Sequence, residues 1–482
     1  MLKNFNKPII NKREWQVMTP FPYTTANGVT VVAPVDDYCD YALVIGTAAS
    51  SALYDYRNDA YEICSNPGLA GTFGFGTCGI YSPWSIKYAA TGGTTNSIVV
   101  SAATHNISGL IIGKPLVVTS GAQEGFTTTV TAVLTSGGIG DIIVYLKDAL
   151  PSALASGDTF KTMSGMYYVV NGGTKIANNF KGFDLGTRTW TVGLNNTALP
   201  NLTAETSMAT AYRHGEYMAS GEVASGTSTT MTSARTTTRE IDLAGNVAPN
   251  WTVDQWKGYQ VTITKDNKRQ TRLIASNTAT TLTVSSAFLF TPDNTCTYKI
   301  EGDEDTLYLL GNNAVTLYEY SINANTWITV NPTVARASAT GGGVTCDIPT
   351  DTKRSEWADE NNIKNGRYIY STRGKGGVEI DRYDIVTNKW EVVNTRTLET
   401  FNTGTSAVIV DGDWYIKRES GNRFLKYNFV DNVMYAFSTI SLTDGTGVFG
   451  QKLHAKRIKG TDIVFVYSVA NSSTTVYRTL LY

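Results

Sequence analysis

One spacing recurs along most of this chain and constrains its fold more than any other feature. An aromatic residue is followed by a polar turn, and a second aromatic or large apolar residue stands seven positions after the first. The clearest copies are Phe183–Trp190, Tyr320–Trp327 and Tyr383–Trp390, and weaker copies are Tyr54–Tyr61 and Tyr427–Met434. Asp or Asn can cap such a turn, and a following Asn, Asp or Gly tolerates a left-handed backbone. Each copy therefore predicts a β-hairpin whose two large side chains face the same layer.

Two further segments precede most copies of this hairpin. One is an apolar run followed by a turn, and the other, further upstream, is rich in Gly, Ala and Thr. The apolar runs are Ala42–Ile45, Tyr167–Val170, Leu307–Leu310, Tyr368–Tyr370 and Trp414–Ile416. The small-residue segments are Gly28–Val32, Met208–Ala211, Gly341–Thr345 and Thr405–Val410. Small residues suit a strand crowded near a central axis, so the sequence predicts four-stranded units like the blades of a β-propeller.

The last unit is incomplete at its end. Strands are predicted at Ile463–Tyr467 and Thr474–Arg478, but no Trp-bearing strand follows them. A suitable segment, Glu14–Met18, stands near the beginning of the chain and contains Trp15. We expect this segment to lie beside the strand that carries Tyr477, because that pairing closes the ring and removes exposed sheet edges. Counted in this way, the units predict six blades.

The complete unit, a Gly-containing apolar strand followed by Tyr-Asp-x-x-Thr-Asn-x-Trp, resembles the kelch repeat of β-propellers. The resemblance covers roughly two thirds of the chain, and its most specific copies end at Trp190, Trp327 and Trp390. The double glycine of the family stands clearly at Gly172-Gly173. The resemblance implies an all-β fold, a six-bladed kelch-like β-propeller closed by its N- and C-terminal strands.

Two gaps between closing aromatics are too long for a kelch-type period of about 50 residues. The long gaps run from Tyr61 to Trp190 and from Trp190 to Trp327. They predict an insertion between the first and second strands of the second blade and another at the same place in the third. The predicted division of the chain is 1–91, 163–221 and 302–482 for the propeller, 92–162 for the first insert and 222–301 for the second.

The two predicted inserts share a plan of short strands with alternating apolar and polar residues. Corresponding segments are Gly113–Thr119 and Gly258–Thr264, and a proline follows the penultimate strand of each insert, at Pro151 and Pro292. Period-two alternation predicts small antiparallel β modules, either barrels or sandwiches, and the shared plan indicates a duplication. Modules of this kind are similar to the small β domains of structural proteins in tailed bacteriophages.

Residue types that catalyse reactions or bind metals are few and scattered. The histidines His105, His214 and His454 lie in unrelated segments without a metal-binding spacing, so we expect structural roles for them. The acidic segment 301–305 could bind Ca²⁺, could hold an acid/base pair, or could be a solvated loop where the second insert rejoins the propeller. We therefore assign no catalytic, metal-binding or cofactor-binding residue and expect no cofactor.

Candidate contacts with partners come from basic runs and from one charged loop that contains a tryptophan. An exposed Trp in such a loop would anchor a contact, and exposed cations could face a protein or DNA. The alternatives are a Trp packed against a blade and a solvated basic face. The candidates are Lys268, Arg269, Arg354, Trp357, Lys456 and Arg457.

Charge and composition exclude several classes of function. Lys and Arg number 40 and Asp and Glu number 41, whereas a protein that coats DNA or an anionic membrane would be basic. No apolar run approaches the ~18 residues needed to span a bilayer. The segment before Trp15 lacks the apolar core of a secretory signal. Five cysteines without a Cys-x-x-Cys pair indicate reduced thiols and folding in a cytosol.

These observations predict a non-enzymatic structural component of a tailed-phage virion, located in the tail or neck and assembled in the cytoplasm of the bacterial host. We expect a homo-oligomer that also contacts other virion proteins, without membrane insertion or sequence-specific binding of nucleic acid. Two alternatives stay open: a phage appendage that binds a host receptor or surface glycan, and a propeller glycan hydrolase (a depolymerase). A structural protein predicts large intersubunit contacts, an appendage predicts exposed stacked aromatics, and a hydrolase predicts paired carboxylates in a cleft.

Overall fold

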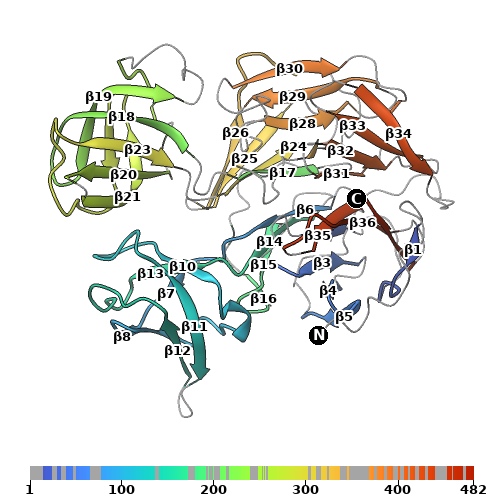
Figure 1. Cartoon of the computed structure of the whole chain (residues 1–482), viewed down its shortest axis with the longest axis horizontal. Helices are drawn as coiled ribbons and strands as arrows, with labels where there is room; N and C mark the ends of the chain where they lie inside the picture. Colours follow the sequence, from blue (N-terminus) through green and yellow to red (C-terminus); the bar gives the residue numbers. More distant parts are fainter. Residues whose placement is uncertain are drawn as a thin grey trace.

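The protein is all-β, and its named strands pair antiparallel (Figure 1). The computed structural model describes residues 15–481 with gaps, the longest of which are 66–76, 172–179, 200–206, 239–247, 337–344, 347–367 and 440–452. Among the described residues the only helical segment is η1 (Gly109–Ile111), a single 3₁₀ turn.

Six four-stranded sheets contain most of the strands that the structure describes, and we number them in chain order. Sheet 1 contains β2 (Thr30–Val32), β3 (Tyr41–Ile45), β4 (Ser51–Asp55) and β5 (Ala60–Ile63). Sheet 2 contains β6 (Cys78–Ser82), β14 (Met166–Val170), β15 (Phe180–Asp184) and β16 (Thr189–Trp190). Sheet 3 contains β17 (Ser207–Tyr212), β24 (Asp305–Leu310), β25 (Leu317–Ser321) and β26 (Thr326–Val330).

The remaining three of these sheets come from the C-terminal part of the described chain, together with one strand from its beginning. Sheet 4 contains β27 (Thr345–Cys346), β28 (Tyr368–Thr372), β29 (Ile380–Asp384) and β30 (Lys389–Asn394). Sheet 5 contains β31 (Ser406–Val410), β32 (Asp413–Lys417), β33 (Arg423–Asn428) and β34 (Val433–Thr439). Sheet 6 contains β35 (Leu453–Arg457), β36 (Val464–Val469), β37 (Val476–Leu480) and β1 (Gln16–Val17).

The predicted hairpins are present in sheets 1 to 5, between the third and fourth strands. In each sheet the two large residues of the seven-residue spacing are direct cross-strand partners. The pairs are Tyr54 with Tyr61, Phe183 with Trp190, Tyr320 with Trp327, Tyr383 with Trp390, and Tyr427 with Met434. Directly opposite side chains on one face of a sheet are close enough to pack, so the spacing holds the third strand to the fourth.

A left-handed residue closes four of these hairpins, five positions after the first aromatic. These residues and their φ angles are Asp59 (50°), Arg188 (55°), Asn325 (51°) and Asn388 (52°). Where the first aromatic is a tyrosine, its hydroxyl donates to the side chain of the left-handed residue. The oxygen–oxygen distances are 2.8 Å for Tyr54–Asp59, 2.7 Å for Tyr320–Asn325 and 2.8 Å for Tyr383–Asn388. In sheet 2 the first aromatic is Phe183, which has no hydroxyl, and an arginine stands at the turn position. Asp and Asn tolerate this backbone conformation better than most residues. They therefore suit the turn for two reasons: the left-handed backbone and the hydrogen bond that their side chain accepts from the tyrosine.

The first strands of sheets 1 to 6 contact one another in a cycle. In chain order, β2 contacts β6, β6 contacts β17, β17 contacts β27, β27 contacts β31, and β31 contacts β35. The cycle returns to its start because β35 also contacts β2. In Figure 1 the labels of β6, β17, β31 and β35 accordingly gather near the middle of the six sheets.

Apolar cores fill the spaces between consecutive sheets. Phe180 of sheet 2, for example, contacts Tyr320 and Trp327 of sheet 3, with ring centroids 4.7 and 5.1 Å apart. One such core joins the last sheet to the first, since Tyr467 of sheet 6 packs against Tyr54 of sheet 1 at 6.0 Å. Each sheet therefore buries both of its faces against its neighbours in the cycle.

The pairing expected between the beginning and the end of the chain is present. Gln16 and Val17 of β1 pair with Arg478 and Tyr477 of β37, so the early strand completes sheet 6. Trp15 packs edge-on against Phe424 of sheet 5, with ring centroids 5.6 Å apart. The segment before sheet 1 is thus held by backbone pairing and by an aromatic contact with the neighbouring sheet.

Two further groups of strands lie between the first and second strands of sheets 2 and 3. Insert 1 contains β7 (Tyr88–Ala89), β8 (Gly92–Thr94), β9 (Ser97–Ser101), η1, β10 (Pro115–Val118), β11 (Thr127–Thr135), β12 (Asp141–Leu146) and β13 (Thr159–Thr162). Insert 2 contains β18 (Tyr217–Gly226), β19 (Thr230–Thr238), β20 (Gln260–Lys265), β21 (Lys268–Asn277), β22 (Thr281–Val284) and β23 (Thr297–Glu301). Figure 1 shows both inserts on the same side of the six sheets, insert 1 in teal and insert 2 in green and yellow.

The strands of the two inserts follow the same order. The order is β7-β13-β10-β11-β12-β9-β8 in insert 1 and β18-β23-β20-β21-β22-β19 in insert 2, where β18 also pairs with β19. The long strand β18 thus occupies the places that β7 and β8 share in insert 1. Both inserts begin earlier than the predicted residues 92 and 222, because Tyr88 and Tyr217 already pair within them, with Phe160 and Glu301.

Replacing the left-handed asparagine of the sheet 4 hairpin will destabilise the protein. Asn388→Ala removes the hydrogen bond from Tyr383 and the one that Asn388 donates to the Asn331 carbonyl, 2.9 Å away, and it strains the backbone. We expect a loss of about 2 kcal/mol in stability, and about half of that for Asn388→Gly, which keeps the backbone relaxed. Thermal unfolding of both variants measures this difference; equal midpoints for the wild type and Asn388→Ala would contradict the assignment.

Removing the ring of Trp15 will loosen the last strand of the chain. Trp15→Ala deletes the contact with Phe424, so β1 will separate more often from β37 and expose its amides. We expect faster hydrogen exchange across Val476–Leu480 and a stability loss of about 2 kcal/mol, with Trp15→Phe in between. Unchanged exchange in this strand would show that β1 is dispensable for holding it.

Candidate functional site

Of the residues predicted to make contacts or to close the propeller, some lie outside the described part of the chain and the others are at least partly buried. Arg354 and Trp357 lie outside the described residues, as do the side chains of Lys268 and Arg269 at the beginning of β21. Trp15 and Tyr477 lie at the junction of β1 and β37 and contribute to the core between sheets 5 and 6. The structure therefore brings together the proposed closure residues but tests only two of the proposed partner contacts.

The prediction that Lys456 and Arg457 present their charges to a partner is wrong. Both are buried, with exposed fractions of 7% and 8%. The Lys456 ammonium donates to the carbonyl oxygen of Cys39 at 2.6 Å and lies 3.4 Å from a carboxylate oxygen of Asp40. A run of cations usually marks a solvated face, but β35 is the first strand of sheet 6 and sheet 1 covers it.

Two of the three histidines, His105 and His454, lie among the described residues. His454 is buried and stacks on Tyr467 with ring centroids 5.1 Å apart, and burial lowers its pKa to about 3. His105 accepts a hydrogen bond from the backbone of Ala89 in insert 1, and burial lowers its pKa as well. His214 and the side chains of the acidic segment 301–305 lie outside the described residues. Among the residues that are described, no cluster of three His, Cys, Asp or Glu could hold a metal.

Insert 1 and insert 2 contact each other through a buried glutamate. Glu124, in the loop between β10 and β11, accepts hydrogen bonds from the hydroxyls of Ser285, at 2.9 Å, and Ser286. Arg272 of insert 2 donates to the backbone oxygen of Glu124 at 3.4 Å. A buried carboxylate is costly unless it is hydrogen-bonded, so this contact fixes one insert against the other at a defined point.

A second buried carboxylate joins insert 1 to sheet 2. Asp184 is fully buried at the end of β15 and accepts hydrogen bonds from the hydroxyl of Tyr88 at 3.0 and 3.1 Å. The backbone N–H of Gly186 donates to it at 2.7 Å, and that of Thr187 at 3.3 Å. Ser108, just before η1, donates its backbone N–H to the carbonyl of Gly186. Burial raises the pKa of Asp184 to about 6 in spite of these donors.

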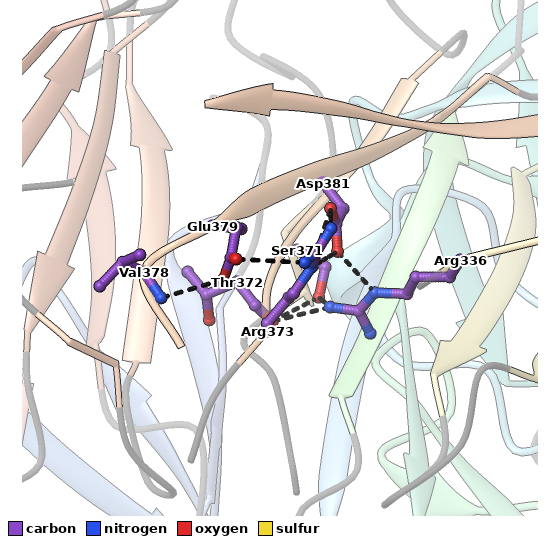
Figure 2. Close-up of polar contacts among 7 residues, drawn as sticks. All are labelled: Arg336, Ser371, Thr372, Arg373, Val378, Glu379 and Asp381. Carbon is purple, nitrogen blue, oxygen red and sulfur yellow. Dashed lines mark hydrogen bonds and ion pairs between the residues drawn. The ribbon is translucent and has the colours of Figure 1, made fainter. Parts of the chain in front are cut away.

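A buried ionic network ties the segment after sheet 3 to sheet 4, as Figure 2 shows. The Arg336 guanidinium donates to the carboxylate of Asp381 at 3.0 Å and to the carbonyl of Thr372 at 2.9 Å. Arg373 binds both oxygens of Asp381 and lies 3.3 Å from Glu379. Two cations face two carboxylates, and both oxygens of Asp381 accept bonds. This saturation suits a structural role better than proton transfer.

Sequence reasoning missed the residues that make these long-range contacts. Glu124 and Arg336 are isolated charges, Asp381 lies in the charged stretch 379–384, and none of the three belongs to a motif. One local signal was available for Glu124. Its loop is flanked by Gly121 and Gly125, whose φ angles of 83° and 84° indicate a backbone shape that favours glycine.

Comparison with other proteins adds no identification at this point. No protein-family model matches the chain, and no curated protein matches it. None of the helical residues that the structure describes forms a segment long and apolar enough to cross a lipid bilayer. The functional assignment therefore depends on the physical arrangement of the chain itself.

The raised pKa of Asp184 predicts a pH-dependent stability. A carboxyl group whose pKa is about 6 in the folded state and 3.8 in its ordinary state stabilises the fold fully below about pH 4. That contribution, on the order of 3 kcal/mol, is lost as the pH rises through 6.

The variant Asp184→Asn will lose less stability than the wild type between about pH 4 and about pH 7. The N–H groups of Gly186 and Thr187 donate to Oδ1, so an Asn can keep these two bonds and donate from its amide nitrogen to Tyr88. Thermal unfolding at several pH values measures the two slopes. Parallel slopes would exclude Asp184 as the titrating group.

Proposed function

We propose that the chain is a non-enzymatic structural component of a tailed-phage virion, in the tail or neck, that acts through protein–protein contacts. Its body would be a six-bladed kelch-like β-propeller closed by the first and last strands. The contacts that run in a cycle through the first strands of sheets 1 to 6 support this architecture, as does the pairing of β1 with β37. The two inserts would be small barrel-like domains, duplicates of one another, as their common strand order suggests.

The observation that carries this proposal is the bracing of the inserts. They interrupt consecutive sheets at the same place, Glu124 joins them to each other, and Asp184 and Tyr88 join insert 1 to sheet 2. A projection held at several points keeps a fixed orientation, which a subunit needs in order to contact several neighbours at once. A net charge of −1 also suits a part that does not retain passing DNA.

The subunit role predicts a fixed, multiple copy number in purified particles. Quantitative mass spectrometry will measure the copy number, and particle reconstruction will measure the interfaces, which we expect to bury about 2,000 Å² or more. Glu124→Ala will lower incorporation into particles severalfold, because the inserts lose their common orientation. Thr127→Ala, at an exposed position three residues further along the chain, serves as the matched control.

Three outcomes would overturn the structural role. The first is absence of the chain from purified particles. The second is a distal position with few neighbours, which would favour the receptor- or glycan-binding appendage. The third is release of reducing ends from host polysaccharide by the purified chain, which would favour the glycan hydrolase.

A further inference from the structure

A histidine is buried where the cycle of sheets closes, between sheet 6 and sheet 1. His454 lies in β35, which contacts β2 of sheet 1, and its side chain is 4% exposed. Its ring stacks on that of Tyr467, the residue opposite it in β36, and its centroid lies 5.8 Å from that of Tyr56, just after β4. Tyr54 of sheet 1 packs against both tyrosines. We call this contact of Tyr54, Tyr56, His454 and Tyr467 the seam.

The imidazole of His454 has no hydrogen-bond partner at either nitrogen among the described residues. The hydroxyl of Tyr56 is also buried and has no partner in the described part of the chain. Buried polar groups are nearly always hydrogen-bonded, because the loss of water is otherwise uncompensated. The closed seam can therefore hold the neutral ring, whereas a charged ring would have nothing to pair with.

The charged side chains on this face of sheet 6 are cations. Lys456 stands two residues after His454, on the same side of β35, and donates to the carbonyl of Cys39 at 2.6 Å. Arg478 lies opposite Tyr467 in the register and donates to the side chain of Gln16 at 3.0 Å. A protonated His454 would add another positive charge to this face, next to Lys456.

The carboxylates described on the sheet 1 side already have partners. Asp40 lies 3.4 Å from the ammonium of Lys456 and forms an ion pair with Arg57. Asp55, at the end of β4, accepts a hydrogen bond from the backbone N–H of Arg57 at 2.8 Å. Its position next to Tyr54 in the strand directs it to the opposite face of sheet 1. Neither carboxylate pairs with His454.

A third carboxylate, Asp59, is held by the hairpin turn of sheet 1. It accepts hydrogen bonds from the hydroxyl of Tyr54 at 2.8 Å and from the backbone N–H of Thr19 at 3.2 Å. The other titratable groups are phenols, which stay neutral in acid because burial raises their pKa values. These phenols belong to Tyr54, Tyr56, Tyr61 and Tyr467.

Burial lowers the pKa of His454 from its ordinary value of 6.5 to about 3. Between these two values, a form in which water reaches the ring binds a proton and the closed form does not. Closure is therefore undisturbed above about pH 6.5 and weakens as the pH falls toward 3. The Asp184 carboxyl works in the opposite direction, because its contribution is lost as the pH rises.

We propose that His454 makes the closure of the cycle acid-sensitive: protonation of its imidazole separates sheet 6 from sheet 1 along the seam. In the open form the imidazolium is hydrated and lies farther from Lys456, which offsets the loss of the contact with sheet 1. The opening is local, because each of the two inserts has a core of its own. This inference does not depend on the proposed structural role.

Hydrogen exchange of the full chain at about pH 7 and about pH 5 tests the proposal. We compare protection factors, which remove the intrinsic pH dependence of amide exchange. With an open-form pKa of 6.5, protection in β35 (Leu453–Arg457) and β36 (Val464–Val469) will fall about 25-fold between these pH values. Protection in β22 (Thr281–Val284) of insert 2 will not change.

Matched variants identify the titrating group. His454→Gln is polar but does not titrate in this range, and His454→Phe keeps an aromatic ring against Tyr467. We expect both to reduce the 25-fold fall to less than about threefold. His105→Gln makes the same substitution at the other described histidine, in insert 1, and will keep the full effect. The ratio between two pH values removes any general loss of stability that a variant causes.

A wild-type ratio close to one would overturn the proposal, as would an equal fall of protection in insert 2. A 25-fold fall that persists in both His454 variants would assign the acid sensitivity to another group and refute the role of His454. The exchange experiment uses the isolated chain, whereas the structural role is tested in particles, so each proposal can fail without the other.

Discussion

The packing of aromatic residues at the hairpin between the third and fourth strands is the interaction on which the rest of the structure depends. Where both members of a cross-strand pair are aromatic, their rings pack closely, with centroids 4.9 Å apart for Tyr54–Tyr61, 5.0 Å for Tyr320–Trp327 and 5.4 Å for Tyr383–Trp390. Aromatic pairs contribute about 0.5–1.5 kcal/mol beyond the area that they bury. The same rings reach the neighbouring sheet, so one pair both closes a hairpin and joins two sheets.

This packing explains how a chain with few charged residues can fold as a cycle of sheets. Because each sheet buries both of its faces, the backbone groups that stay exposed are those at the edge of its outermost strand. The sixth sheet takes its outermost strand from the beginning of the chain, so residues 462 positions apart, Gln16 and Arg478, pair and hydrogen-bond. The inserts add their own cores beside this body. Insert 1 is attached to it by the buried Asp184 and by Leu110, which packs against the core of sheets 1 and 2, and Glu124 joins the two inserts.

The local part of the fold could be predicted because its signals are short in sequence. The spacing from Tyr383 to Trp390 implies a hairpin whatever the rest of the chain does, and Asn388 marks its left-handed turn. The insert boundaries were less accurate, since the pairing of Tyr88 with Phe160 depends on a strand far along the chain. The burial of Lys456 could not be predicted, because the group that covers it, Cys39, lies 417 positions away.

The sequence by itself determined the hairpins and their repetition, because backbone hydrogen bonding and side-chain alternation depend on near neighbours. It also indicated the pairing of the two ends, because the last repeat unit lacks a strand that the beginning of the chain supplies. Only the tertiary structure decided which charges are solvated and which are paired inside. The same residue types became a buried link between inserts at Glu124, a saturated network at Arg336, and a buried contact between sheets at Lys456. The cost of burying a charge is set by the partners that surround it, and those partners come from sheets distant in sequence.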